Sequence, residues 1–169
     1  MKIIFIGHPG SGKTYAAELL SSKLNIEKVD LDVLLDKSPL NFVSKKLYRK
    51  AFKKLLGDKK DWLIDGYHGH KMPDYIWHKA DLIIFLDLPR NELKRNVLIR
   101  YKAKKTNRDF THAQHTFTNN IKNFYQIHFL DKSMRKNVSR IKLLVDDSDK
   151  FVTLKSSDQL NSFIDNLKP

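Results

Sequence analysis

The sequence contains no cysteine and no long apolar run, and it has few carboxylates for the number of its basic side chains. Without cysteine, neither disulfide bonds nor a thiolate metal site can contribute to this protein. The longest apolar runs, residues 3–6 and 82–86, are far too short to span a bilayer or to act as the apolar part of a signal peptide. These absences favour a cytoplasmic protein with no membrane partner.

The shortage of carboxylates leaves a formal charge of +13, from 32 lysine and arginine residues against 19 aspartate and glutamate residues. Two segments carry most of the imbalance: residues 45–60, where the only acidic residue is Asp58, and residues 90–108, where it is Glu92. Such a field attracts polyanions, either nucleotides or nucleic acid. The alternative is a solvated, lysine-rich surface without a specific partner.

The 169 residues, 41% of them hydrophobic, are enough for one globular domain with a sizeable core. The sequence shows no internal repeat, low-complexity tract or linker. Apolar segments of strand length alternate with helical patterns throughout. This alternation predicts a single three-layer α/β domain over residues 1–169, built on a parallel sheet.

The first fourteen residues combine an apolar run with the segment GHPGSGKT at positions 7–14. This segment fits the phosphate-binding pattern G-x-x-x-x-G-K-[ST], in which backbone N–H groups at a helix N-terminus form an anion site. Lys13 is expected to reach the terminal phosphates, and the Thr14 hydroxyl to ligate magnesium. The alternative is a glycine-rich turn without a ligand. Because a strand precedes the loop and a helix over 13–24 follows it, we predict that ATP binds to Gly7, Pro9, Gly10, Ser11, Gly12, Lys13, Thr14 and Tyr15.

Three carboxylates occur at the ends of short segments that are expected to be strands. Residues 28–32 end in Asp30 and Asp32, which lie on the same side if both belong to the strand. Either could orient an acceptor hydroxyl or hold water around magnesium, while helix capping by Asp32 is the alternative. Asp65 ends a buried strand that begins at Trp62. Because ligands bind beyond the carboxyl ends of parallel strands, we predict that Asp65 meets magnesium, with an ordinary Asp-Gly turn as the alternative.

Helical patterns flank these strands. Residues 42–56 form an amphipathic helix that ends at Gly57, and residues 74–79 form a short one. The apolar run at 80–86 is typical of a central parallel strand. The next helix, from 90 to about 105, is expected to pack through Leu93, Val97, Leu98 and Tyr101.

In the last third of the sequence, one long helix is predicted over residues 111–135, packing through Phe117, Ile121, Phe124 and His128. Residues 138–145 continue at helical spacing, although residues 141–145 are also compatible with a strand. Residues 151–154 are expected to form the last strand. Ser157 and Asp158 then cap a closing helix.

Arginine offers planar, permanently charged donors to phosphoryl oxygens. Arg95, Arg100 and Arg108 stand where a closing lid would lie. We expect one or two of these three to contact phosphate, since most arginines on a helix are simply solvated.

Several segments together resemble the bacterial DNA topology modulation protein family, which is similar in turn to adenylate and shikimate kinases. These segments are residues 7–14, 31–32, 62–66 and 80–90, with Arg95 and Arg100. The resemblance extends over nearly the whole chain. The loop at 7–14 is shared by nucleotide-binding proteins generally, and the Leu-Asp-Leu-Pro-Arg sequence at 86–90 is the segment that indicates the topology modulation family. The resemblance implies a five-stranded parallel sheet in the order 2-3-1-4-5, a small lid around residues 104–110, and ATP-dependent phosphoryl transfer.

The resemblance also implies residue roles: Gly12, Lys13 and Thr14 for ATP and magnesium, Asp32 beside the acceptor, and Arg95, Arg100 and Arg108 for the lid. Adenylate kinases follow the Asp-Gly pair with an aromatic residue, Pro and an Arg that grips the acceptor phosphate. Here Tyr67 is followed by His68 and Gly69. The acceptor is therefore predicted only as a nucleotide or a small hydroxyl compound.

Two functions follow from these observations. The first is a kinase whose catalytic residues are Lys13, Asp32, Arg95, Arg100 and Arg108, with magnesium on Thr14, Asp65 and Asp30. The second is a nucleotide-gated nucleic-acid-binding regulator that uses the basic clusters, although no known DNA-binding motif is evident. A GTPase switch is disfavoured because no Asn-Lys-x-Asp segment occurs.

Overall fold

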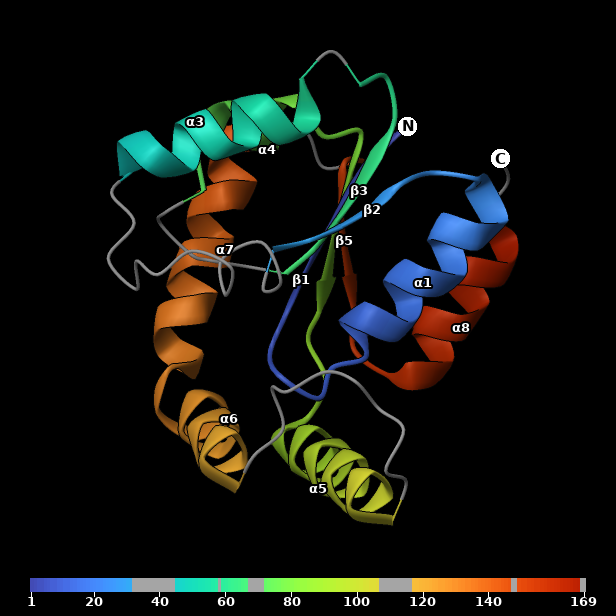
Figure 1. Ribbon diagram of the computed structural model, residues 1–169, viewed down its shortest axis with the longest axis vertical. Helices are drawn as coiled ribbons and strands as arrows, with labels where there is room; N and C mark the ends of the chain where they lie inside the picture. The colour runs from blue at the N-terminus through green and yellow to red at the C-terminus, as the bar shows by residue number, and fades with distance from the viewer. Residues whose placement is uncertain (32–44, 58, 67–71, 107–116, 147–148, 168–169) are drawn as a thin grey trace.

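A computed structural model of the chain describes residues 1–31, 45–57, 59–66, 72–106, 117–146 and 149–167 (Figure 1). The elements follow one another in the order β1 (Lys2–Gly7), α1 (Lys13–Leu24), β2 (Lys28–Asp30), α3 (Lys45–Leu56), β3 (Trp62–Asp65), α4 (Asp74–Lys79), β4 (Leu82–Leu86), α5 (Arg90–Thr106), α6 (Phe117–Phe129), α7 (Asp131–Val145), β5 (Phe151–Leu154) and α8 (Ser157–Asn166).

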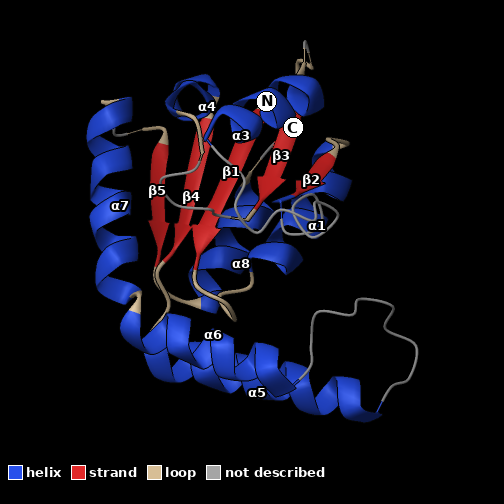
Figure 2. Ribbon diagram, turned by 60° about the vertical axis from the view of Figure 1, so that its left-hand side comes forward, coloured by secondary structure: helices blue, strands red, loops and turns tan. Residues whose placement is uncertain are grey.

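The five strands form one sheet in the order β2-β3-β1-β4-β5, and every neighbouring pair is parallel. Figure 2 shows the strands pointing the same way, with helices on both sides of the sheet. The expected α/β architecture and the expected strand order are both confirmed. Because β1 is central, the loop that follows it emerges at the middle of the carboxyl edge, where ligands bind in such sheets.

Two apolar cores lie on the two faces of this sheet. Ile4 and Ile6 of β1 belong to the core under α3, α4 and α7, whereas Ile3 and Phe5 belong to the core under α1, α5 and α8. Successive side chains of a strand point to opposite faces, so a strand covered on both sides is apolar throughout. The unbroken apolar run of β1 therefore fits a strand that is covered on both faces.

Several helix boundaries agree with expectation. The helices α1 and α4 span the predicted residues, and Gly57 ends α3 with a φ of 43° and its N–H donated to the carbonyl oxygen of Lys53. Residues 141–145 are helical, which settles the alternative between helix and strand. The side chain of Ser156, one residue before the predicted cap, accepts the N–H of Gln159 at the start of α8.

The prediction of one helix over residues 111–135 was wrong, because the chain turns at Leu130 between α6 and α7. The two helices serve opposite faces of the sheet: α6 contributes Ile127 to the core that includes α1, and α7 contributes Val138 and Ile141 to the other core. A straight helix could not reach both faces.

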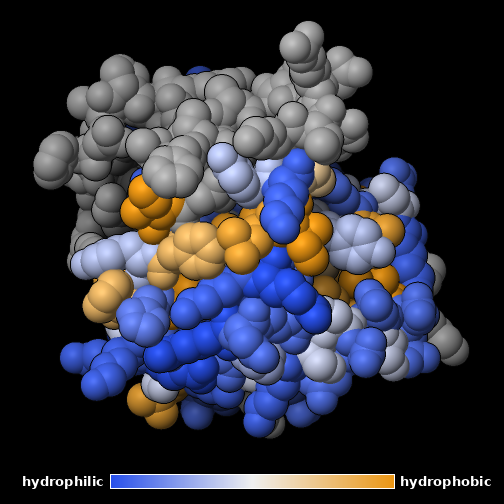
Figure 3. Space-filling model, turned by 90° about the horizontal axis from the view of Figure 1, so that it is seen from below, coloured by the Kyte–Doolittle hydropathy of each residue, from blue (hydrophilic) through white to orange (hydrophobic). Residues whose placement is uncertain are grey.

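The inward faces of α5 and α6 agree with expectation only in part: Leu93, Val97 and Phe124 pack against the core as predicted, but other side chains do not. Leu98 is 46% exposed and Ile121 is 55% exposed, and His128 is exposed while its neighbour Ile127 is fully buried. Seen from the side of α5 and α6, apolar side chains interrupt a largely hydrophilic surface (Figure 3). Among the described helices, none has the length and apolar character needed to cross a membrane.

Candidate functional site

The segment between β1 and α1 forms a tight loop against α5. Gly10 and Gly12 have φ values of 80° and 89°, in the left-handed region that favours glycine. A Cβ atom on Gly10 would lie 2.5 Å from the carbonyl oxygen of Leu93. Asn96 of α5 donates its side-chain N–H to the Gly10 carbonyl oxygen at 2.9 Å. The glycines thus allow the close approach, and α5 holds the loop in its curled conformation.

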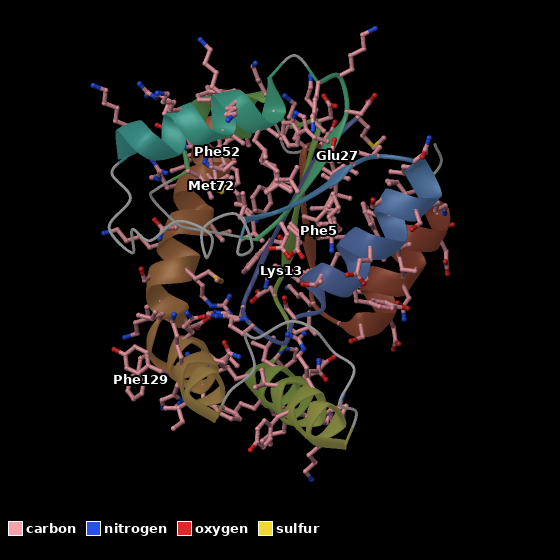
Figure 4. The ribbon with its side chains drawn as sticks, in the orientation of Figure 1. Phe5, Lys13, Glu27, Phe52, Met72 and Phe129 are labelled. Carbon is pink, nitrogen blue, oxygen red and sulfur yellow. The ribbon has the colours of Figure 1, made fainter. Side chains whose placement is uncertain are left out.

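Lys13 is the first residue of α1, and its side chain folds back over the loop. Its Nζ donates to the carbonyl oxygen of His8 at 2.8 Å and lies 3.5 Å from the Ser11 Oγ. Figure 4 shows Lys13 between the end of β1 and the start of α1. Its charge therefore lies beside the backbone N–H groups of the helix N-terminus, where an anion is favoured.

Two of the predicted carboxylates meet at the carboxyl ends of neighbouring strands. Asp30 of β2 and Asp65 of β3 are paired in the parallel register. Burial raises the pKa of Asp65; the charge of Lys13 and a hydrogen bond from Thr14 oppose this rise, and Asp30 adds to it. These causes show that Lys13, Thr14, Asp30 and Asp65 share one electrostatic environment at the loop.

The donor set at this edge fits magnesium, which prefers hard oxygen ligands and keeps several waters. Thr14 supplies a hydroxyl, and Asp30 and Asp65 supply carboxylates. No group of three or more histidine, aspartate or glutamate side chains able to hold a metal ion occurs in the described part of the chain. A dedicated all-protein cage is thus missing from that part, whereas shared coordination by protein, phosphate and water remains chemically suitable.

Some of the other predicted site residues lie outside the described residues, and for the rest the structure shows how far they are exposed. Asp32, Arg108 and lid residues 107–110 lie outside the described residues, and residues 104–106 end α5. The strand β2 ends at Asp30, and Leu31 is helical. On α5, Arg95 is exposed and Arg100 is half-buried; on the loop side, Pro9 is half-buried and Tyr15 exposed. The proposed roles of these residues stay predictions.

A second set of charged groups beside the loop was not predicted. The His8 Nε2 lies 3.0 Å from the Oδ1 of Asp131, at the start of α7. Arg90 of α5 and Arg135 of α7 donate to the Asp131 Oδ2 at 3.0 and 3.1 Å. Arg135 also forms two hydrogen bonds with Asp87, at 2.8 and 3.0 Å. We call these five residues the Asp131 cluster; it connects the loop to α5, α7 and the end of β4.

The Asp131 cluster has a defined charge state. Although burial raises the pKa of Asp131, hydrogen bonds from Arg90, Arg135 and His8 lower it to about 2. Burial lowers the pKa of His8 despite the nearby carboxylate. A neutral His8 beside an ionised Asp131 must donate through Nε2–H, since the carboxylate can only accept. Its buried Nδ1 is then an acceptor, and it has no hydrogen-bond partner among the described residues.

The sequence contained little signal for the Asp131 cluster. His8 occupies a position that the loop pattern leaves unspecified, and Asp131 is 123 residues away from it along the chain. Two local patterns included residues of the cluster: the Leu-Asp-Leu-Pro-Arg segment at 86–90, which contains Asp87 and Arg90, and the spacing of Asp131 and Arg135, four residues apart on one helix. Such local patterns do not predict contacts between elements that are far apart in the sequence.

No family model matches the chain, nor does any curated protein. The assignment therefore depends on the order of the strands and on the position of the glycine-rich loop after the central strand. The chain has the sheet topology of P-loop NTPases. Within that class, the order 2-3-1-4-5 matches the nucleoside monophosphate kinases. The narrower resemblance to the DNA topology modulation family stays a prediction.

The variant Asp65→Asn is expected to unfold at a higher temperature at neutral pH than the parent protein. Because burial raises the pKa of Asp65, the carboxyl's contribution to stability is present at low pH and is lost as the pH rises through the folded-state pKa. Asparagine removes the buried charge and still accepts the Thr14 hydroxyl. The same variant should lose about 10- to 100-fold in magnesium-dependent activity.

Thermal unfolding at several pH values and magnesium titrations of activity test this expectation. Asp165→Asn, which removes an exposed charge from α8, is the control and should change neither quantity appreciably. A lower unfolding temperature for Asp65→Asn at neutral pH would contradict the electrostatic argument, and unchanged magnesium dependence would contradict the role of Asp65 as a ligand.

Proposed function

We propose that the chain is an ATP-dependent phosphotransferase, which transfers the γ-phosphoryl group of Mg·ATP to a nucleotide or a small hydroxyl acceptor. One observation carries the proposal: the phosphate loop, the Lys13 ammonium and the Thr14–Asp65 hydrogen bond converge at the carboxyl edge of the central strands. P-loop kinases use this edge for phosphoryl transfer.

In this proposal the loop binds the donor phosphates through its backbone N–H groups and the N-terminus of α1. The Lys13 ammonium already lies at the loop, where it donates to the His8 carbonyl oxygen and lies 3.5 Å from the Ser11 Oγ. It would donate to phosphate oxygens when the nucleotide enters. Gly10 and Gly12 carry no side chain and adopt left-handed φ values, which let the loop backbone curl toward a bound phosphate.

Magnesium would be held by Thr14 together with Asp65 and Asp30, directly or through water. When bound, the ion neutralises charge on the phosphates and helps to align them for transfer. The chain's own contribution is to place the Asp65 carboxyl group beside Thr14 and to offset part of the rise in its pKa that burial causes. The Lys13 charge and the Thr14 hydrogen bond both favour its ionised form against the effect of burial.

The acceptor side of the reaction is assigned to residues near the loop and the lid. Asp32, or Asp30 in its place, would orient the acceptor hydroxyl for attack on the γ-phosphorus. Arg95, Arg100 and Arg108 would donate to the transferred phosphoryl group, which carries its charge on the equatorial oxygens. Residues 104–110 would close over the site and exclude water.

An acceptor panel tests the proposal. Purified protein is incubated with Mg·ATP and, in separate reactions, nucleosides, nucleoside monophosphates and small alcohols. ADP release and the mass of the phosphorylated product are then measured. We expect acceptor-dependent ADP release with at least one compound, and phosphorylation of that compound. Tight ATP binding with no transfer to any member of a broad panel would contradict the assignment.

A further inference from the structure

A hollow of about 760 Å³ lies at the amino edge of the sheet, at the opposite end of β1 from the phosphate loop. Lys2 begins β1 and Gly7 ends it, so the two places are roughly 17 Å apart along an extended strand. The hollow is therefore separate from the proposed ATP site. Its volume is in the range of small-molecule sites, about 300–1,000 Å³.

The rim of this hollow is strongly basic. Six cationic side chains line it, from the start of β1, α3, the α3–β3 connection and the end of α4: Lys2, Arg49, Lys53, Lys59, Lys60 and Lys79. Only one of these, Lys59, forms a salt bridge within the described residues, with Glu27. Nitrogen-tipped side chains point outward from α3 in Figure 4. Cations gathered in one concavity repel each other, and an anion placed among them relieves that repulsion.

The floor of the hollow is apolar and offers one polar group. Phe52 and Trp62 are almost fully buried in it, and Figure 4 shows Phe52 on the inner side of α3. Tyr75 also lines the hollow, with the Lys79 ammonium 5.9 Å from the centre of its ring. The Tyr75 hydroxyl is buried and has no hydrogen-bond partner among the described residues. An O–H group in this state is a donor that a bound anion could use.

We propose that this hollow is a second anion-binding site, which takes a compact ligand carrying two or more phosphate groups. The concave shape and the six cationic side chains that line it fit several phosphates held close together. Single-stranded nucleic acid is disfavoured, because such binding uses exposed aromatic side chains on which bases stack. Here Phe52 and Trp62, which line the hollow, are almost fully buried.

Inorganic tripolyphosphate is the probe, and calorimetric titration of the whole protein at about 0.15 M salt is the measurement. In the Lys13→Met protein, where the loop site is impaired, tripolyphosphate is expected to bind with one equivalent per chain. Adding Lys53→Glu and Lys60→Glu should weaken this binding at least about tenfold, because charge-assisted hydrogen bonds are the strong ones. The matched control, Lys122→Glu with Lys136→Glu, makes the same charge change on α6 and α7 and should weaken it far less.

Tyr75→Phe gives a readout that a structural role alone would not produce. Removing a buried, unpartnered hydroxyl should raise the unfolding temperature of the ligand-free protein. The same change should weaken tripolyphosphate binding, because the phosphate loses a donor. A variant that is more stable and also binds tripolyphosphate unchanged would remove Tyr75 from the proposed site and overturn its part in the argument.

Competition identifies the source of the phosphates. Displacement of tripolyphosphate by ATP in the Lys13→Met protein supports a nucleoside polyphosphate, whereas failure of ATP to displace it supports an inorganic polyphosphate. Absence of tripolyphosphate binding to Lys13→Met, or equal weakening by the control pair, overturns the proposal. Binding of an oligothymidylate of about twelve nucleotides that tripolyphosphate does not displace also overturns it, in favour of nucleic acid. None of these outcomes depends on phosphoryl transfer.

Discussion

Replacing Lys13 with methionine is expected to reduce phosphoryl transfer by about 10³-fold, which is the upper part of the range for removing one preorganised donor to developing charge. The Lys13 ammonium lies over the loop at 2.8 Å from the His8 carbonyl oxygen, so its charge is already in position when phosphate enters. Methionine keeps most of the side-chain volume and removes the charge. The quantities to measure are the initial rate with Mg·ATP and an acceptor from the panel, and the dissociation constant for ATP.

Lys23→Met is the matched control for this variant. Lys23 lies on the same helix, and its Nζ donates to the backbone carbonyl oxygens of Ile164 and Asp165 on α8. Its loss should lower the unfolding temperature slightly and leave transfer unchanged. If the Lys13→Met enzyme keeps transfer within about tenfold of the parent rate, the loop does not supply the main phosphate-binding charge.

Truncating Asp131 is expected to cause the largest loss of stability among the charged residues at the site. The variant Asp131→Ala removes the carboxylate that accepts from His8, Arg90 and Arg135. Removing one partner from a buried ion pair typically costs about 3–5 kcal/mol, and the two arginines are half-exposed, so we expect about 3 kcal/mol. Urea unfolding measures the change. Because His8 belongs to the loop, ATP affinity should fall as well.

Asp74→Ala is the control for that experiment. Asp74 also lies in the first turn of a helix and pairs with an arginine, but its contact with Arg140 is 3.4 Å long and exposed to solvent. Exposed pairs contribute about 0–1 kcal/mol. Equal losses in the two variants would show that Asp131 acts as an ordinary surface charge and not as the organising group of the cluster.

The Asp131 cluster also predicts how stability depends on pH. The folded-state pKa of Asp131 is lowered, so its contribution is full above the unfolded value near 3.8 and is lost as the pH falls toward 2. His8 is lowered too, so its contribution is lost as the pH falls from its ordinary value of 6.5. Asp131→Ala should remove the loss of stability at acidic pH, and His8→Gln should remove the loss that begins near neutral pH. Urea midpoints across this pH range provide the check.

The candidate site was predictable where its residues are close together in the sequence. The loop at 7–14 and the strand ending in Asp65 are contiguous patterns, and the parallel topology brings the end of each strand to the same edge. Asp30 and Asp65 are therefore adjacent, as expected for neighbouring strands. The expected strand over residues 28–32 was too long, because β2 ends at Asp30; Asp32 lies outside the described residues.

The apolar faces of the later helices were harder to predict. On α6, the spacing of Ile121, Phe124 and His128 suggested one inward face. Phe124 packs against the core as predicted, but Ile127 is fully buried there and Ile121 and His128 are exposed. Periodicity identifies a helix, but the buried stripe is selected by the elements against which the helix packs. The break at Leu130 has the same origin, since α6 and α7 pack into the cores on opposite faces of the sheet.

The sequence by itself determined the strands, most of the helices and the glycine-rich loop, because each depends on local periodicity or on a contiguous run of glycine, lysine and threonine. Only the tertiary structure decided that His8 meets Asp131 and that cations from β1, α3, the α3–β3 connection and α4 surround one hollow. Both arrangements join side chains that are far apart in the sequence. Their electrostatic effect comes from burial and from distances of a few ångströms, and the fold alone sets these quantities.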